Sequence, residues 1–483
     1  MASRSSSASK SRLNKEGLDA HYAAIQKAYL SDGRPWVVGY SGGKDSTATL
    51  QSVWYALSAL PKEKLHKKVY VISSDTLVET PVIVNYIAKT TAAMATAARD
   101  QGLPFETVRL IPQTDDTFWV NLIGRGYPAP YNRFRWCTDR LKIRPANKFI
   151  KDTVADYGEA LVVLGARKAE SATRSQVMSS RKGVGEMFSR HSNLPNAWVY
   201  TPIEDWTTDE VWEYLIGVPS PWGGRNHELV TMYRNAQAGE CPLVIDKSTP
   251  SCGNSRFGCW ICTVVTKDTS MEAMIDSGED WLEPLLRFRD LVASTQDPAV
   301  KRKYRNYRRR SGQVHTKTRG DGKGLILGPY YLWFRKQLLK ELLAAQETVR
   351  SEGPEDDATL ITEAELARIR QLWRFEEGDW EDSLPRIYEE VTGRSLHLEQ
   401  DDWSGLGKLE HEVLAEVCEE AAIPVGLLSE LFDAERKAYG MGRRAGIFEG
   451  LDRVIRKDWR TEDEVYAELE DDDVNGADDE ELE

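Results

Sequence analysis

Cysteine is scarce in this sequence, and several features that define common classes of protein are missing. Six of its 483 residues are cysteine, too few for a fold held together by disulfides. No apolar run approaches the roughly 20 residues that a membrane-spanning helix requires. Residues 1–16 lack the apolar core of a signal peptide, and we expect them to be a disordered arm. These absences favour a cytoplasmic protein that does not contact a membrane.

Basic residues are absent from the C-terminal end. Residues 461–483 contain 13 acidic residues and no lysine or arginine, so they account for the whole net charge of −13. The rest of the chain is therefore neutral overall. We expect 461–483 to be a disordered acidic tail, which either solvates the chain or occupies a basic groove and excludes nonspecific nucleic acid.

What the sequence does contain is a regular alternation of short apolar runs with amphipathic segments. The runs expected to form strands are 36–40, 69–73, 105–110, 161–164 and 198–203. Such strands, separated by helices, predict an α/β fold with a doubly wound parallel sheet that helices cover on both faces. Ligands of such a sheet bind beyond the carboxyl ends of its strands.

A glycine-rich turn follows the first expected strand, where residues 41–47 read Ser-Gly-Gly-Lys-Asp-Ser-Thr. The glycines let backbone N–H groups approach phosphate oxygens, Lys44 adds a positive charge, and the next helix presents its electropositive N-terminus. The spacing is not that of the Walker A pattern, which needs four residues between its first glycine and Gly-Lys-Ser. The residues expected to bind a nucleotide here are Ser41, Gly42, Gly43, Lys44, Asp45 and Ser46.

Polar residues also follow the second and fourth expected strands. Asp75 puts a carboxylate where a base or ribose could lie, although aspartate at such a position often only caps the next helix. Arg167 and Arg174 lie on either side of Glu170. Arginine forks suit phosphate or sulfate oxygens, whereas a pair between Arg167 and Glu170 would be structural. Both arginines are candidates for substrate binding.

These segments together resemble the PAPS reductase family of the PP-loop ATP pyrophosphatases. The loop at 41–47, the segment Gly165–Arg174 and the sequence Pro-Ile-Glu-Asp-Trp-Thr at 202–207 occur in that order. The resemblance covers about residues 35–265. It implies an adenine nucleotide α-hydrolase-like fold and cleavage of ATP between its α- and β-phosphates, which yields AMP and pyrophosphate.

Four of the six cysteines are clustered. Cys241, Cys252, Cys259 and Cys262 fall within 22 residues, while Cys137 and Cys418 lie far from them. Clustered cysteines in a cytoplasmic protein favour a metal site or catalysis, and four thiolates can hold either an iron–sulfur (4Fe-4S) cluster or zinc. We expect Cys418 to belong to a helical core.

The family resemblance favours iron over zinc. Reductases of this superfamily that bind a 4Fe-4S cluster use a Cys-x2-Cys pair together with a cysteine before a basic helix. Cys259, Cys262 and Cys137 resemble these positions, although Cys137 is single where the reductases have a pair. We expect Cys137, Cys252, Cys259 and Cys262 to be the ligands, in preference to sets that contain Cys241. The remaining Cys241 either carries a persulfide or is an inert buried thiol.

The rest of the chain is less informative. We expect a PP-loop domain with its cysteine-rich segment over 17–265, a helical and basic extension over 266–350, and a mostly helical C-terminal region over 351–460. Within the first of these, residues 219–265 are rich in Gly, Pro, Asn and Cys, so we expect them to be irregular. Residues 301–323 hold ten cations and one acid. That density favours contact with a DNA backbone, and the alternative is a solvated helix face.

Two phrases, at 131–142 and 240–259, resemble the DndC-type sulfurtransferases of bacterial DNA phosphorothioation. This resemblance implies that ATP with Mg2+ adenylates a DNA backbone phosphate oxygen, which sulfur then replaces. A cysteine desulfurase would supply the sulfur, and companion Dnd proteins would handle the DNA. The residues expected to carry the chemistry are Lys44, Asp45, Arg167, Arg174 and Cys241.

Two other functions stay open. One is a reductase of adenylyl sulfate, although such enzymes usually end in a mobile C-terminal cysteine and this chain does not. The other is a noncatalytic assembly subunit whose nucleotide site only regulates the docking of a partner.

Overall fold

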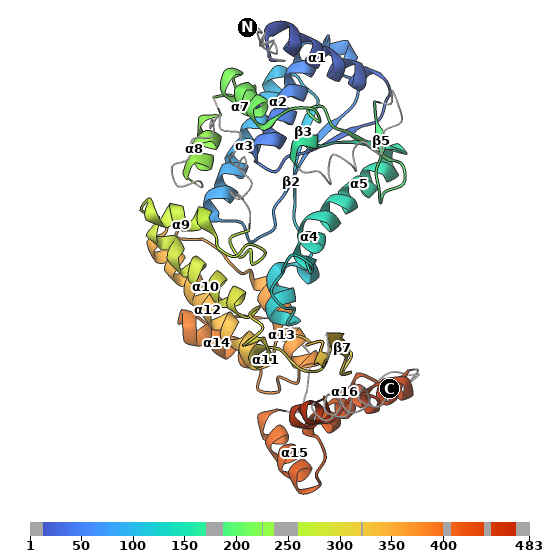
Figure 1. The fold of residues 1–483 in the computed structure, drawn as a ribbon, viewed down its shortest axis with the longest axis vertical. Helices are drawn as coiled ribbons and strands as arrows, with labels where there is room; N and C mark the ends of the chain where they lie inside the picture. Colours follow the sequence, from blue (N-terminus) through green and yellow to red (C-terminus); the bar gives the residue numbers. More distant parts are fainter. Residues whose placement is uncertain are drawn as a thin grey trace, which may run out of the picture. The chain divides into compact units, whose positions relative to one another are not determined.

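The fold is described from a computed structural model, which covers residues 13–170, 187–224, 226–235, 259–319, 322–398, 407–438 and 446–469 (Figure 1). The chain divides into two compact units. Unit 1 comprises Met1–Gln113 and Arg135–Leu286, and unit 2 comprises Thr114–Phe134 and Arg287–Glu483. None of the helices in the described ranges is both long enough and apolar enough to cross a membrane.

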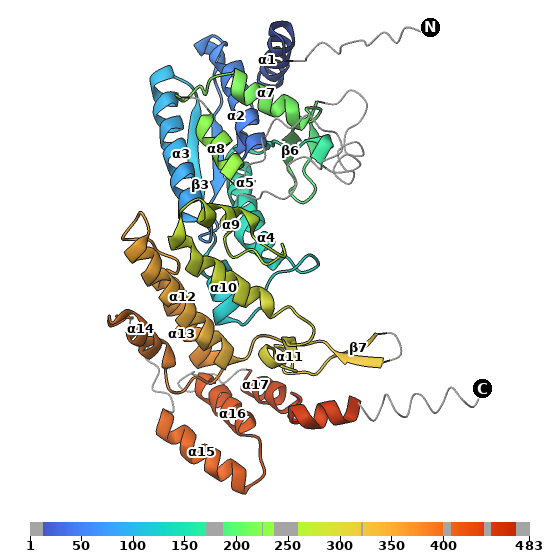
Figure 2. The same cartoon turned by 60° about the vertical axis from the view of Figure 1, so that its left-hand side comes forward.

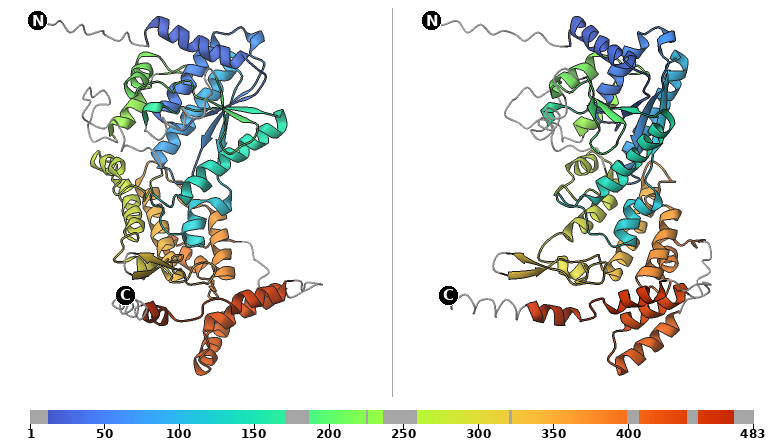
Figure 3. Two further views of the ribbon diagram at one scale, coloured as in Figure 1. Left: turned by 45° about the vertical axis from the view of Figure 1, so that its right-hand side comes forward. Right: turned by 90° about the vertical axis from the view of Figure 1, so that its right-hand side faces the viewer.

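Unit 1 is built on a six-stranded sheet with the strand order β3-β2-β1-β4-β6-β5. The strands are β1 (Trp36–Gly39), β2 (Val69–Ser74), β3 (Phe105–Leu110), β4 (Ala160–Val163), β5 (Ser189–Arg190) and β6 (Ala197–Tyr200). Neighbours from β3 to β6 pair in parallel, and the short edge strand β5 is antiparallel to β6. Figure 3 shows the ribbon from two further directions. The predicted parallel α/β sheet is thus confirmed, with an antiparallel edge added.

Helices pack on both faces of this sheet because its central strands are apolar throughout. Trp36 and Val38 of β1 lie in one core with α1 (Lys15–Leu30), α2 (Lys44–Ser58) and α3 (Pro81–Gln101) (Figures 1 and 2). Val37 faces the other way and packs with Ile150 of α5 (Arg144–Tyr157). Successive side chains of a strand point to opposite faces, so one short run supplies both cores.

The helix ends of unit 1 follow local sequence rules. Pro81 opens α3, which ends at Gly102 with φ +62°, a left-handed conformation that glycine adopts without strain. Thr207 and Glu210 form the capping box that begins α7 (Thr208–Gly217). The other helical segments of unit 1 are η1 (Lys62–Lys64), α4 (Trp136–Thr138), η4 (Asp139–Ile143), η5 (Lys168–Glu170), α8 (His227–Asn235), α9 (Thr269–Asp276) and η6 (Asp280–Leu282).

Two expectations for unit 1 need adjustment. The last parallel strand ends at Tyr200 and not at Ile203, since Pro202 has no N–H to donate to a neighbouring strand. The segment 219–265, expected to be irregular, contains the helix α8. Residues 236–258 of that segment lie outside the described ranges.

Unit 2 is mostly helical, as predicted for the C-terminal region. Its elements are η2 (Thr114–Asp116), η3 (Val120–Gly124), α11 (Lys301–Tyr304), β7 (Thr316–Arg319), β8 (Gly322–Leu325), α12 (Leu332–Glu352), α13 (Glu363–Glu376), α14 (Ser383–Thr392), α15 (Lys408–Glu420), α16 (Val425–Ala438) and α17 (Ile447–Ile455). The helix α10 (Glu283–Ser294) runs from the last residues of unit 1 into unit 2. Cys418 is fully buried in α15, which confirms its expected place in a helical core.

The core of unit 2 joins segments that are far apart in sequence. Trp119 Nε1 donates a hydrogen bond of 2.6 Å to the Leu360 carbonyl, and Trp373 Nε1 donates one of 2.9 Å to the Ile123 carbonyl. The buried Arg335 donates to the Gly124 carbonyl at 2.7 Å. Residues 114–134 are therefore held within unit 2 by partners on α12, on α13 and just before α13.

Candidate functional site

The PP-loop joins the carboxyl end of β1 to the first turn of α2. Gly42 has φ +74°, and a Cβ there would lie only 3.0 Å from Ile87 Cγ1, so glycine is required on two counts. Gly43 is the N-cap of α2 and contributes no side-chain cap. Because the first N–H groups of a helix lack intrahelical acceptors, this end of α2 is suited to an anion.

Hydroxyl groups hold the shape of the loop. Ser46 Oγ donates to the Gly43 carbonyl at 3.0 Å and lies 3.0 Å from Ser41 Oγ. Thr47 Oγ1 donates to the same carbonyl at 2.9 Å. The side chains of the predicted nucleotide-binding residues Ser41 and Ser46 therefore contact each other across the turn.

One carboxylate in the loop is shared by two cations. Asp45 Oδ2 lies 2.9 Å from Lys44 Nζ, and Asp45 Oδ1 accepts a hydrogen bond of 2.6 Å from Arg167 Nε. Arg167 is 2% exposed and also donates to Thr208 Oγ1 at 3.3 Å. Two cations against one acid leave a net positive charge where a phosphate would bind.

The carboxyl end of β4 approaches this loop closely. A Cβ at Gly165 would lie 2.7 Å from the Asp45 carbonyl oxygen and 3.0 Å from the Ser46 nitrogen. Only glycine allows the two backbones to come this near. Gly165 therefore sets the distance at which Arg167 reaches Asp45.

Sequence reasoning missed Tyr233, which lies on α8. Its hydroxyl accepts a hydrogen bond of 3.3 Å from the Lys44 amide, and its ring centroid lies 5.8 Å from Lys44 Nζ. The ring packs edge-on against Trp212 at 4.9 Å. No local motif marks Tyr233, because its role depends on a contact across 189 residues.

Asp75 lies at the end of β2, beside the PP-loop strand. Its carboxylate accepts a hydrogen bond of 2.8 Å from Arg109 Nε of β3 and another of 2.8 Å from the Leu77 amide. It does not cap α3, whose N-cap is Thr80. Asp75 therefore closes the turn after β2, and Arg109 is a neighbour that the sequence did not reveal.

The cysteine pair lies against this same turn. Cys259 and Glu79 form an antiparallel bridge, and the Trp260 amide donates to the Val78 carbonyl at 3.0 Å. Cys259 Sγ lies 3.4 Å from Thr76 Oγ1. Since β1 and β2 are adjacent and parallel, the PP-loop and the turn that Cys259 contacts follow neighbouring strands at the carboxyl ends of the sheet.

The thiol of Cys137, on α4, lies within electrostatic range of both Cys259 and Cys262. Burial, and next the nearby Cys262, raises the pKa of Cys137. The pKa of Cys259 is raised to about 11, mainly by burial; Glu79 and Cys137 act in the same direction, and Lys142 opposes the shift. Three predicted ligands therefore share one neighbourhood, in which burial favours the protonated form of Cys137 and Cys259.

These thiols do not by themselves form a metal site. Within the described ranges, no group of three histidine, cysteine, aspartate or glutamate residues is arranged to hold a metal ion. Cys241, Cys252 and Arg174 lie outside those ranges. Cys137, Cys259 and Cys262 would need at least one further ligand to hold a cluster.

The basic stretch 301–323 is not a single solvated helix face. It forms α11, an irregular turn and the hairpin β7–β8 (Figure 2). Arg305 Nε donates to the Gly328 carbonyl at 2.9 Å, and Arg309 donates to the Leu327 carbonyl at 2.9 Å. Part of this basic charge therefore organises unit 2, while the side chains of Arg302 and Lys303 are exposed.

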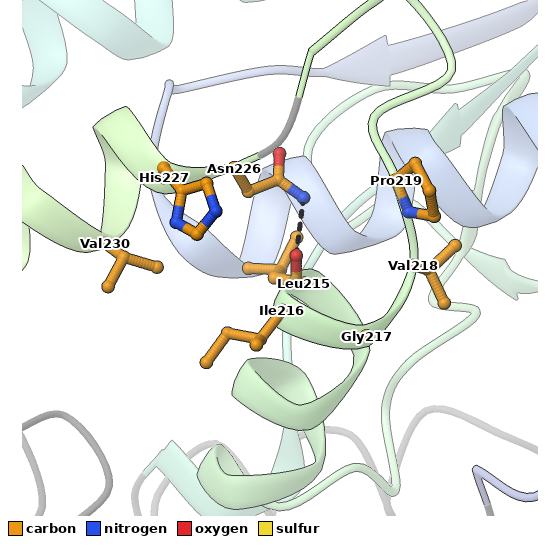
Figure 4. A pocket seen from close by; sticks show the side chains of 8 residues that line it. All are labelled: Leu215, Ile216, Gly217, Val218, Pro219, Asn226, His227 and Val230. Carbon is orange, nitrogen blue, oxygen red and sulfur yellow. Dashed lines mark hydrogen bonds between the residues drawn. The ribbon is translucent and has the colours of Figure 1, made fainter.

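A surface pocket lies where the end of α7 meets the start of α8 (Figure 4). Asn226 crosses it and donates a hydrogen bond of 2.9 Å to the Leu215 carbonyl. Its lining, which comprises 215–219 together with Asn226, His227 and Val230, includes no PP-loop residue and no cysteine. The pocket is therefore separate from the candidate site.

Comparison with known proteins agrees with this geometry. Residues 35–265 match the phosphoadenosine phosphosulfate (PAPS) reductase domain. Just under half of the chain therefore forms a PAPS reductase-like nucleotide-binding domain of the PP-loop type. An uncharacterised protein of Methanocaldococcus jannaschii is 27% identical over 198 residues, which are 41% of this chain and 35% of that protein. The chain thus spans about a third of the length of this relative.

Two solved structures are also similar. The PAPS reductase of Candida auris, in a phosphate complex, has 14% identity and a TM-score of 0.27 over 43% of this chain and 90% of that one. The U34-tRNA thiolase NcsA of Methanococcus maripaludis, with its 4Fe-4S cluster, has 14% identity and a TM-score of 0.28 over 46% and 73%.

Proposed function

We propose that this protein is an ATP pyrophosphatase that activates a DNA backbone phosphate and takes part in replacing one of its oxygens with sulfur. The observation that carries the proposal is the bridge between Glu79 and Cys259. It puts a cysteine pair on the turn after β2, while the PP-loop follows the adjacent strand β1. A nucleotide site and a group of thiols at one edge of a sheet favour activation followed by sulfur transfer.

In the activation step, the pyrophosphate part of ATP lies on Ser41–Ser46. A non-bridging oxygen of the DNA phosphate forms a bond to the α-phosphorus, and the bond from that phosphorus to the oxygen bridging to the β-phosphorus breaks. Pyrophosphate leaves with the electron pair. Lys44 and Arg167 already surround Asp45, and these preorganised donors stabilise the developing negative charge.

Asp45 holds both cations in position before ATP binds. We assign Arg174 to the same charge-stabilising role. Mg2+ is expected on the triphosphate, because the loop cannot neutralise it alone. Asp75, with Arg109 beside it, is the candidate contact for the base or ribose.

In the sulfur step, the terminal sulfur of a cysteine persulfide attacks the activated DNA phosphorus, and AMP leaves with the adenylated oxygen. A second thiol then cleaves the sulfur–sulfur bond. This leaves a phosphorothioate on the DNA and a disulfide between the two cysteines, so the electrons balance. Cys241 is the proposed persulfide carrier, and a cysteine desulfurase is the proposed sulfur source.

The substrate class rests on the basic stretch of unit 2. Arg302 and Lys303 are exposed on α11, and such cations favour a polyanion over a small sulfonucleotide. Companion Dnd-type proteins are the proposed partners in handling DNA. The proposed compartment is the cytoplasm, where thiols stay reduced.

One alternative, which fits the same match to the PAPS reductase domain, is the reduction of adenylyl sulfate. In that reaction the loop binds a sulfonucleotide and a cysteine attacks sulfur. A noncatalytic assembly subunit would bind ATP without cleaving it.

One assay separates the three functions. Purified protein is incubated with α-labelled ATP, with and without duplex DNA, and in parallel with adenylyl sulfate and a thiol reductant. The proposal predicts DNA-stimulated formation of AMP and pyrophosphate. Sulfite release from adenylyl sulfate supports the reductase, and bound but uncleaved ATP supports the assembly subunit.

A further inference from the structure

Cationic and aromatic side chains share one surface of unit 2, around α11 and the first turn of α12. Lys303 Nζ lies 5.6 Å from the ring centroid of Tyr304. Tyr304 in turn lies 6.1 Å from the ring of Trp333, which is 47% exposed. Exposed cations beside aromatic rings are the groups that bind nucleic-acid backbones and unpaired bases.

The chain between α17 and residue 461 is anchored beside this surface. Tyr307 Oη donates a hydrogen bond of 2.7 Å to the Arg460 carbonyl. Arg308 donates to the Asp458 carbonyl at 3.0 Å and lies 5.2 Å from the Trp459 ring. Residues of the basic stretch therefore fix the point from which the acidic end of the chain begins.

The acidic segment that follows contacts the surface directly. Residues 462–469 form a short α-helix. Its first residue, Glu462, accepts a hydrogen bond of 2.8 Å at Oε2 from Tyr331 Oη. The guanidinium of Arg302 lies 4.5 Å from the Tyr466 ring. Val465, between these two residues, is 2% exposed. The Glu462 carboxylate and the Tyr466 ring thus contact Tyr331 and Arg302, which a DNA phosphate or base would otherwise contact.

We propose that residues 462–469 cover part of the DNA-binding surface of this chain and compete with DNA for it. This inference rests on the DNA contact in the proposed function. The segment contacts Arg302 through Tyr466 and Tyr331 through Glu462. It also carries Asp463, Glu464 and Glu468, of which Glu464 accepts from the Thr461 amide and Glu468 pairs with Arg460. DNA must displace it, and a chain without these charges binds DNA more tightly.

The test compares two variants with the same change of net charge. E462Q/E464Q/E468Q neutralises the covering segment, and glutamine at 462 can still accept from Tyr331. E412Q/E416Q/E419Q is the matched control, because these glutamates are exposed on α15 of the same unit. Binding of a fluorescent 30-base-pair duplex is measured by anisotropy at several salt concentrations.

We expect the first variant to bind DNA at least about fivefold more tightly than the full-length protein, and the control to differ by less than about twofold, because the effect of a charge on DNA binding is local. Tyr466→Ala keeps every charge and is also expected to tighten binding, since it releases Arg302. Equal effects of the two charge variants, or no effect of either, would overturn the inference.

A chain that ends at Arg460 separates this inference from the proposed function. If the full-length and shortened chains bind DNA equally, the DNA contact stands and the covering role fails. If no variant, including the shortened chain, binds DNA at any salt concentration, the DNA contact itself fails, and the covering role fails with it. Thermal unfolding of each variant checks that unit 2 remains folded.

Discussion

Arg167 Nε and Asp45 Oδ1 are joined by a hydrogen bond of 2.6 Å, which links the loop after β4 to the first turn of α2. Arg167 is almost fully buried, whereas the Asp45 side chain is 22% exposed. The same carboxylate pairs with Lys44. The one acidic side chain of the PP-loop therefore holds two cations in place before any nucleotide binds.

Arg167→Ala should damage both folding and function. It leaves Asp45 with one cation and removes a buried hydrogen-bonded ion pair, so we expect the free energy of unfolding to fall by about 2–4 kcal/mol. Arg167→Lys keeps the charge but loses the fork, and it should recover less than half of the lost ATP affinity. Urea unfolding and ATP titration measure the two effects. An unchanged ATP affinity in Arg167→Ala would exclude a role in binding.

Lys44→Ala should stop catalysis while the fold persists. Lys44 supplies charge to the phosphates, and its loss should slow AMP formation by at least about 100-fold. Since Asp45 keeps its bond to Arg167, stability should change by less than about 1 kcal/mol. The control is Lys68→Ala, which removes the exposed pair with Glu106 and should leave the rate unchanged. Comparable loss in both variants would contradict the assignment.

Gly165→Ala tests the close approach of β4 to the loop. The added methyl group would lie 2.7 Å from the Asp45 carbonyl oxygen, so the loop must shift, at a cost of about 1–3 kcal/mol. The matched control is Gly217→Ala at the end of α7, where nothing lies within 4 Å. That change should be neutral or stabilise by up to about 1 kcal/mol. Thermal unfolding and ATP affinity are measured for both variants. Equal stability and ATP affinity of the two variants would rule out a tight contact at Gly165.

His21 should make unit 1 sensitive to acid. Burial beside Trp206 lowers the pKa of His21 to about 4, and among the residues that the structure describes its Nε2 has no hydrogen-bond partner. The unfolded chain therefore binds the extra proton first, and stability present above pH 6.5 is lost as the pH falls toward 4. Between pH 7 and pH 5 the loss should be about 2 kcal/mol. His21→Phe should abolish that part of the slope, and an unchanged slope would show that other groups cause it.

The cysteines can be tested through metal content. If iron binds, Cys137→Ser, Cys259→Ser and Cys262→Ser should each lose the visible absorption of anaerobically purified protein, whereas Cys418→Ser should keep it. Cys418 is buried on α15 in the other unit, which makes it a control for thiol loss. Iron and zinc are measured in every sample. Colourless protein with one equivalent of zinc would rule out the iron–sulfur cluster.

The sheet and the loop were predictable because their signals are local. Residues 36–40 and 105–110 form strands within one residue of the expected ends. The first is apolar because it is a buried central strand, whereas the second is an edge strand that exposes Glu106 and Arg109 between buried ends. The PP-loop requires glycine at particular backbone positions, and these glycines can be recognised directly in the sequence. The capping box at Thr207 is visible for the same reason.

What was not predictable depends on contacts across long stretches of sequence. Tyr233 reaches Lys44 from α8, and Arg109 reaches Asp75 from the neighbouring strand. Neither pair leaves a periodic or compositional signal. The basic stretch showed its charge in the sequence, but not that Arg305 and Arg309 bind carbonyls of their own unit.

The most direct measurement counts products in one reaction. Protein, ATP, duplex DNA and persulfide-loaded cysteine desulfurase are incubated, and AMP and phosphorothioate linkages are quantified by mass spectrometry of the digested DNA. We predict one AMP for each phosphorothioate formed, with both products absent in Lys44→Ala. Phosphorothioate without AMP, or ADP and phosphate in place of AMP and pyrophosphate, would contradict activation by adenylation at the Ser41–Thr47 loop.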